Sequence, residues 1–220
     1  MLTSVLERIL PRVRKPARYV GGEKGSVVKQ KEGIRLRFAF CFPDVYEVGM
    51  SHLGSRILYG LLNREEDIWC ERVFAPWIDM EAEMRREGIA LYGLESGDSL
   101  QEFDVIGFTL QYELSFSNIL NMLDLAGIPL YAKDRKTLKN LVVAGGPCAY
   151  NPEPLADFID LFMIGDGEEV ILELCGLYKT AKEQGWEKTE FLKKACHIPG
   201  VYVPSLYEVS YQDDGTIQAV

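Results

Sequence analysis

Apolar runs alternate with helical stripes from residue 35 onward. Short, almost wholly apolar runs predict strands at 35–42, 68–75, 104–110, 141–144 and 160–164. Helices are predicted between them at 51–63, with Ser51 as its cap, and at 77–87, 114–126 and 168–182. Strands that are apolar on both sides are typical of a parallel sheet covered on both faces. The expected fold is therefore α/β, with a doubly wound, mostly parallel, five-stranded Rossmann-like sheet.

The two ends of the chain follow other patterns. Apolar residues spaced three and four apart between Leu2 and Val13 predict an N-terminal helical arm that Pro11 and Pro16 bend or end. Near the other end, 188–196 predicts a short helix and 200–204 an extended segment, followed by a hairpin of 206–210 and 216–220 about Asp213-Asp214-Gly215. The sequence is thus divided into an arm (1–30), an α/β domain (31–185) and a helix plus β-hairpin (186–220).

Charge separates the arm from the rest. The chain has 24 Lys and Arg against 33 Asp and Glu, a net charge of −9, yet residues 1–30 hold seven basic residues and two acidic ones. The acidic body argues against direct binding of nucleic acid, which relies on clustered Lys and Arg. The basic arm is expected to dock on that body or on another domain, and this reading is favoured over a membrane or targeting segment.

No apolar run approaches the roughly 18–20 residues of a membrane helix, and the start of the chain lacks the pattern of a secretory signal. We therefore expect a cytoplasmic protein with no membrane partner. Its five cysteines, Cys41, Cys70, Cys148, Cys175 and Cys196, are too widely spaced for a C-x-x-C pair. They are expected to be reduced thiols, with no zinc or iron–sulfur site in this chain.

Candidate chemistry lies in the segments that follow the strands, because ligands of open parallel sheets bind beyond the carboxyl ends of the strands. These segments, Pro43–His52, Thr109–Glu113, Gly145–Cys148 and Gly165–Glu168, are predicted to meet at one edge. Their glycines would let a ligand approach the backbone. Neither the G-x-G-x-x-G nor the G-x-x-x-x-G-K-[ST] fingerprint is present, and no G-x-S-x-G supports a hydrolase.

Several of these segments together resemble a known family. Asp44-Val45-Tyr46-Glu47-Val48-Gly49 is similar to the cobalamin-binding motif D-x-H-x-x-G, with Tyr46 at the histidine position. Thr109-Leu110 and Gly145-Gly146 stand where such domains place a hydroxyl residue and a glycine pair. PDVYEVGMSHLG (43–54), LVVAGGPCAYNPEPLADFID (141–160) and FMIGDGEE (162–169) resemble the cobalamin-binding-type domain at the N-terminus of radical S-adenosylmethionine (radical SAM) enzymes.

The resemblance implies a set of cobalamin-binding residues: Asp44, Tyr46, Gly49, His52, Thr109, Leu110, Gly145, Gly146, Pro147, Gly165, Gly167 and Glu168. Because tyrosine replaces the usual histidine, it implies a corrin without histidine ligation, and Tyr46→His is expected to restore a ligand. His52 is interpreted as structural rather than as a cobalt ligand. A β-branched residue at Gly146 is expected to reduce cobalamin binding sharply while the fold survives, provided that Gly146 does not need a positive φ.

The C-x-x-x-C-x-x-C motif that holds a [4Fe–4S] cluster is absent. The chain is therefore not expected to be catalytic alone, and S-adenosylmethionine and the cluster are assigned to a radical SAM domain expected beyond Val220. The leading hypothesis is a binding module that supplies cobalamin, or keeps a vestigial cobalamin pocket, beside that catalytic barrel. The alternative is a cofactor-free docking or substrate-binding domain with the same fold.

Overall fold

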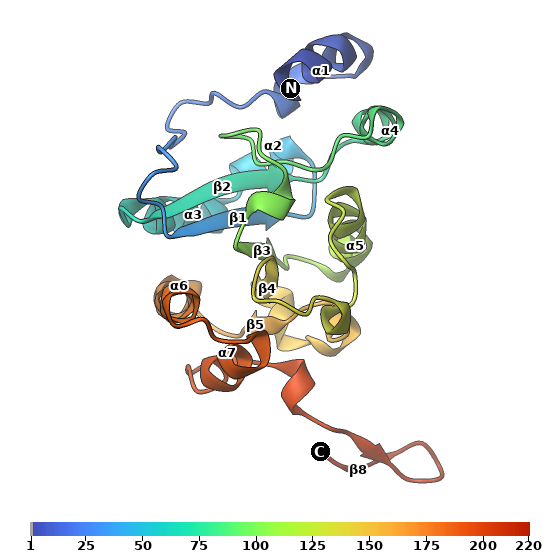
Figure 1. The fold of residues 1–220 in the computed structure, drawn as a ribbon. Helices are drawn as coiled ribbons and strands as arrows, with labels where there is room; N and C mark the ends of the chain where they lie inside the picture. Colours follow the sequence, from blue (N-terminus) through green and yellow to red (C-terminus); the bar gives the residue numbers. More distant parts are fainter. Residues whose placement is uncertain (1) are drawn as a thin grey trace.

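A six-stranded sheet carries the fold in the computed structural model, which describes residues 2–220 (Figure 1). The parallel strands are β1 (Leu36–Phe42), β2 (Ile68–Phe74), β3 (Val105–Thr109), β4 (Leu141–Gly145) and β5 (Leu161–Met163), in the order β2-β1-β3-β4-β5. These five parallel strands confirm the predicted α/β fold with a Rossmann-like, mostly parallel sheet. A sixth strand, β6 (Val201–Tyr202), pairs antiparallel with β5, so the expected count of five was one too low. Its two residues were predicted only as extended chain.

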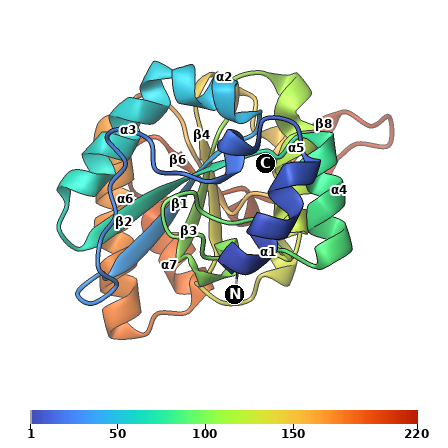
Figure 2. The ribbon, with the colours of Figure 1, turned by 90° about the horizontal axis from the view of Figure 1, so that it is seen from above.

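Helices cover both faces of this sheet, as expected for a doubly wound fold (Figure 2). One face carries α3 (Leu53–Arg64), α6 (Gly167–Gln184) and α7 (Lys188–Ala195). The other carries α1 (Leu2–Ile9), α4 (Ile78–Glu87) and α5 (Phe116–Leu125). The N-terminal arm and α7 both join these cores, since Ile9 and Phe191 are fully buried.

The first connection differs from its prediction. Instead of one helix from Ser51, the chain forms a short helix α2 (Tyr46–Ser51) and then α3. His52 breaks them apart with an extended backbone, and its Nδ1 accepts the Ser55 N–H at 3.1 Å. His52 is thus the N-cap of α3, a role that the sequence reading had given to Ser51.

The C-terminal hairpin is present, formed by β7 (Ser210–Tyr211) and β8 (Ile217–Ala219) in antiparallel pairing. Side chains from residue 205 onward are exposed, so the hairpin extends away from both cores (Figure 1). Among residues 2–220, no helix combines the length and the apolar character that crossing a membrane requires.

The basic arm docks on the acidic body. Arg8 pairs with Glu87 at 3.3 Å and Arg12 with Glu83 at 3.4 Å, both on α4. Lys15 and Arg18 both contact the Glu47 carboxylate at 2.9 Å. Of the two docking partners left open by the sequence, the chain's own body is therefore the one observed.

Side chains complete the hydrogen bonds on the outer side of β2, where no further strand pairs. Lys29 Nζ donates to the Ile68 carbonyl at 2.6 Å, and the Asn63 amide bonds both the N–H and the carbonyl of Cys70. The Arg72 N–H donates to the Glu95 carboxylate at 2.8 Å, and the Arg72 carbonyl accepts the Leu94 N–H. From Ile68 to Arg72, this side of β2 is therefore satisfied without a strand partner.

The Glu47 contacts predict a pH-dependent attachment of the arm. Hydrogen bonds from Lys15, with Arg18 beside it, lower the pKa of Glu47 from 4.5 to about 2. A lowered carboxyl pKa adds stability above the unfolded value, and that stability is lost as pH falls from about 4.5 toward 2. Glu47→Gln should therefore lower Tm by about 1–3 °C at pH 7, the range of a largely exposed pair.

Thermal melts at several pH values test this expectation. The Tm difference between the unmodified chain and Glu47→Gln should shrink steadily below pH 4.5. Glu7→Gln is the matched control, because Glu7 is an exposed arm carboxylate that pairs with no side chain of residues 5–220. A difference that stays constant with pH, or an equal effect of Glu7→Gln, would contradict the role of Glu47.

Candidate functional site

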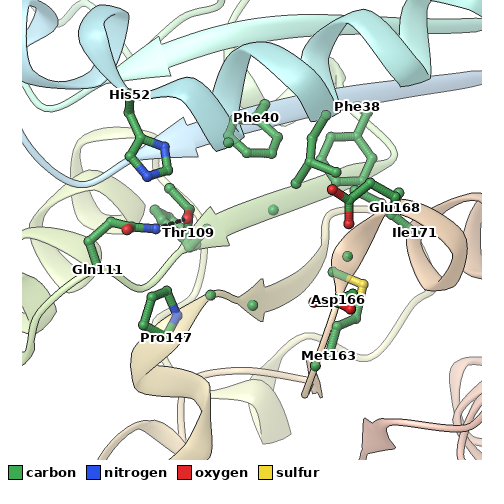
Figure 3. Close-up of a pocket in the computed structure, with 18 of the residues that line it drawn as sticks. Phe38, Phe40, His52, Thr109, Gln111, Pro147, Met163, Asp166, Glu168 and Ile171 are labelled. Atoms are coloured by element: carbon green, nitrogen blue, oxygen red, sulfur yellow. Dashed lines mark hydrogen bonds between the residues drawn. The ribbon is translucent and has the colours of Figure 1, made fainter.

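A cavity of about 480 Å³ opens at the carboxyl edge of the parallel strands (Figure 3). All four predicted segments contribute to it, which confirms that they meet at one edge. The predicted residues that line it are His52, Thr109, Gly145, Gly146, Pro147, Gly165, Gly167 and Glu168. Its volume is in the range of small-molecule pockets.

The topology explains its position. The chain leaves β1 toward α3 on one face of the sheet and leaves β3 toward α5 on the other. Neighbouring loops that part in this way open a crevice at the switch point between two strands. Phe40 of β1 and Thr109 of β3 line the cavity at this point.

Two glycines keep the floor of the cavity open. A Cβ on Gly107, in the middle of β3, would lie 2.5 Å from Phe38 Cζ. Gly146 has a φ of +105°, and a Cβ there would lie 3.0 Å from the Leu110 carbonyl oxygen and 3.2 Å from Thr109 Oγ1. Gly146 therefore needs the positive φ that only glycine adopts readily, and the condition for a tolerated β-branched substitution is not met.

His52 lines the cavity while it caps α3. Its Nδ1 accepts the Ser55 N–H and also contacts Ser55 Oγ at 2.8 Å. A ring nitrogen that accepts leaves the proton of the neutral imidazole on Nε2. Metal ligation through Nε2 would require Nδ1 to carry the proton and so to release the Ser55 N–H. The hydrogen bonds thus support the structural interpretation of His52 and make its Nε2–H a donor.

The remaining polar groups give the cavity an acidic character. Asp166 and Glu168 stand at the start of α6, and no Lys or Arg is among the lining residues. Gln111 Nε2 donates to Thr109 Oγ1 at 2.6 Å (Figure 3). The hydroxyl that contacts a base here, Ser55 Oγ beside His52 Nδ1, is not among the lining residues of the cavity.

Asp44 and Tyr46 lie outside the cavity. The Asp44 carboxylate accepts hydrogen bonds from the Tyr112 hydroxyl and from the Val45 N–H. The Tyr46 ring packs edge-on against Phe74, with 5.5 Å between centroids. Burial, and a hydrogen bond to Glu23, raise the pKa of Tyr46. The side chain at the histidine position of the motif thus faces the arm and not the cavity.

Gly49 and Leu110 also have structural positions. A Cβ on Gly49 would lie 2.2 Å from the Phe74 ring, so glycine is needed for α2 to pack over the sheet. Leu110 is fully buried, and its N–H donates to the Gly145 carbonyl at 2.7 Å. Its own carbonyl accepts the Cys148 N–H, which holds the loop after β4 against β3.

Sequence reasoning missed much of the apolar lining: Phe38, Phe40, Gly54, Leu58, Gly107, Phe108, Tyr150, Met163 and Ile171. One signal could have located part of it. A glycine inside an apolar strand often marks a close approach, and Gly107 interrupts β3 in this way. The aromatic residues of β1 carry no such signal, since they are equally typical of a buried core.

The five cysteines form no disulfide, and Cys41, Cys70 and Cys175 are buried. Burial raises the pKa of the Cys175 thiol to about 12, so it is unreactive near neutral pH. Within residues 2–220, no three His, Cys, Asp or Glu side chains gather as metal ligands would.

Two comparisons with known proteins bear on this site. The family model described as "Radical SAM proteins, N-terminal" matches residues 54–204, which include most of the cavity lining. An uncharacterized protein of Methanocaldococcus jannaschii is 29% identical over 187 residues, covering 79% of this chain and 36% of the relative. The chain thus spans little more than a third of the length of this curated relative.

The φ of Gly146 generates a stability prediction. Gly146→Val should destabilise the fold by about 1–3 kcal/mol, because it places a branched side chain at a positive φ and against Leu110. Urea unfolding measures the loss. Gly167→Ala is the matched control in the same cavity, since its φ is not positive and its Cβ would meet Leu58 at an ordinary 3.6 Å. Equal stability of Gly146→Val and the unmodified chain would contradict the assignment.

The cap at His52 generates a second stability prediction. His52→Ala should cost about 1 kcal/mol, because the Ser55 N–H loses its acceptor. His52→Asn should recover most of that loss, since asparagine is a preferred N-cap. Chemical denaturation of the two variants gives the test, and a failure of asparagine to restore stability would show that the ring acts other than as a cap.

Proposed function

The chain belongs to the radical SAM protein N-terminal family, and from that premise we propose that it is a ligand-binding module which supplies cobalamin to a radical SAM catalytic domain. The observation that carries the proposal is the glycine-floored cavity at the switch point of the sheet. Such crevices are where open α/β sheets bind their ligands. The ligand would be held beside the catalytic domain. The substrate of that domain depends on parts of the longer protein outside this chain.

The lining fits the nucleotide end of cobalamin. Phe38, Phe40 and Met163 offer an apolar wall for its ring, and Gly145 and Gly146 leave the backbone open to the tail. The cavity of about 480 Å³ is too small for the corrin as well, which would lie across the mouth. The acidic side chains of Asp166 and Glu168 favour placing the phosphodiester away from α6, on the glycine side.

The positions of Tyr46 and His52 are compatible with a corrin whose cobalt has no protein ligand. Tyr46 faces Phe74, and His52 uses its Nδ1 to cap α3. We therefore expect Tyr46→His to leave the corrin spectrum unchanged, contrary to the expectation from the motif alone. When bound, cobalamin would supply methyl transfer or a related radical rearrangement. The chain's own part is to bind and orient.

We assign the [4Fe–4S] cluster and S-adenosylmethionine to a following domain of a longer protein. The length of the Methanocaldococcus jannaschii relative, of which this chain spans 36%, supports that assignment. A C-x-x-x-C-x-x-C motif within about a hundred residues after Val220 in the full reading frame would identify the domain. A reading frame without this motif would contradict it.

A second candidate function has its own supporting observation. Tyr150, which lines the cavity, is 77% exposed, and Leu53 and Leu114 are 66% and 88% exposed. They come from the segments after β1, β3 and β4. Large exposed apolar side chains on the segments at this edge of the sheet are a feature of contact surfaces. A cofactor-free domain that docks the catalytic barrel or a substrate is therefore the alternative.

A spectroscopic titration with hydroxocobalamin separates the two functions. The unmodified chain should give a saturable change in the visible spectrum. Gly167→Leu should weaken binding about tenfold or more, because its side chain would enter the mouth beside Leu58, and Gly167→Ala should bind as the unmodified chain does. No saturable change at high micromolar cobalamin, with the fold intact, would contradict the cofactor proposal and favour the docking domain.

A further inference from the structure

A second cavity lies on the opposite side of α3 from the first. Its volume is about 550 Å³, and it is bounded by α3, the ends of β1 and β2, and arm residues 24–27. Four aromatic side chains line it: Phe40, Phe42, Tyr59 and Phe74. Neither the proposed function nor the packing of the fold uses this space.

The charge at this cavity is opposite to that of the first. Its lining residues include Lys24, Arg56, Arg64 and Arg72, and no Asp or Glu. Arg72 is fully engaged in the wall, since its guanidinium bonds Glu23, Ser26, Glu95 and the Met50 sulfur and stacks over Tyr59. The carboxylates of Glu23 and Glu95 are thus held by Arg72, which leaves the cations at the mouth to face solvent.

The three cations at the mouth are available to a ligand. Lys24, Arg56 and Arg64 are exposed, and none forms an ion pair or side-chain hydrogen bond with residues 5–220. Arg56 and Arg64 lie eight residues apart on α3, about 12 Å along the helix at 1.5 Å per residue. In a body that is acidic overall, such a gathering of unpaired cations around an aromatic cavity favours an anion.

Gly60 supplies an independent observation. It lies between Arg56 and Arg64 inside α3, and a Cβ placed there would meet nothing within 4 Å. Glycine inside a helix costs about 0.5–1 kcal/mol relative to alanine, and no close contact requires it at this position. Its effect is to leave a notch in the helix wall between the two arginines, which opens the cavity to the cations.

We propose that this second cavity binds a phosphate-bearing aromatic ligand such as a nucleotide. The flat ring lies against Phe42, Phe74 and Tyr59, and the phosphates lie at the mouth between Arg56, Arg64 and Lys24. The site differs from the proposed cobalamin pocket, whose lining is acidic; the two cavities lie on opposite sides of α3 and have Phe40 as their one common lining residue.

The probe for the test is ADP that carries a methylanthraniloyl fluorophore on its ribose. The unmodified chain should bind it saturably, and inorganic pyrophosphate should displace it. Gly60→Leu should weaken binding at least tenfold by filling the notch. Gly176→Leu, the same change at a glycine of α6 that lines neither cavity and whose Cβ would meet nothing within 4 Å, is the matched control and should retain binding. Arg56→Gln combined with Arg64→Gln should also weaken binding about tenfold or more while leaving the interior unchanged.

The same variants decide against the proposal if it is wrong. Absence of saturable binding by the unmodified chain up to about 1 mM would overturn it. Unchanged nucleotide binding in the variant with both Arg56→Gln and Arg64→Gln would also overturn the proposal. This second variant keeps the test valid even if the Gly60→Leu protein does not fold. Binding lost in Gly167→Leu but kept in Gly60→Leu would assign the nucleotide to the first cavity. Cobalamin titration of Gly60→Leu should match the unmodified chain.

Discussion

The common direction of five strands is the constraint on which the functional part of this molecule depends. Because β1 to β5 are parallel, their carboxyl ends come to one edge, and four segments distant in sequence meet there. Because the chain then leaves β1 and β3 toward opposite faces, the segments part and leave a cavity. The position of the cavity thus follows from topology, and its shape from a few residues such as Gly107 and Gly146.

Two cavities with oppositely charged lining residues lie on the two sides of helix α3. On one side of it, Asp166 and Glu168 face a cavity without basic residues, and on the other side Arg56 and Arg64 face a cavity without acidic ones. The two cavities thus differ in the sign of the charged side chains that line them.

Periodicity and strand-end logic predicted the fold and the edge at which the cavity lies, because both depend on local patterns. They could not predict side-chain direction. Tyr46 fills a motif position, but the packing of α2 against Phe74 turns its ring toward the arm. The break at His52 was also missed, since its cap depends on a ring nitrogen that accepts the Ser55 N–H. Such features depend on three-dimensional contacts that spacing does not encode.

The outer side of β2 has a consequence for how molecules of this protein meet one another. An uncovered strand of seven residues is usually a template for strand addition from a second molecule. Here Lys29, Asn63, Glu95 and the Leu94 N–H occupy its backbone groups. At the other end of the sheet, β6 is only two residues long. Neither edge of the sheet thus offers a long row of free backbone groups to a second molecule. Part of the protection at β2 comes from the basic arm, through Lys29.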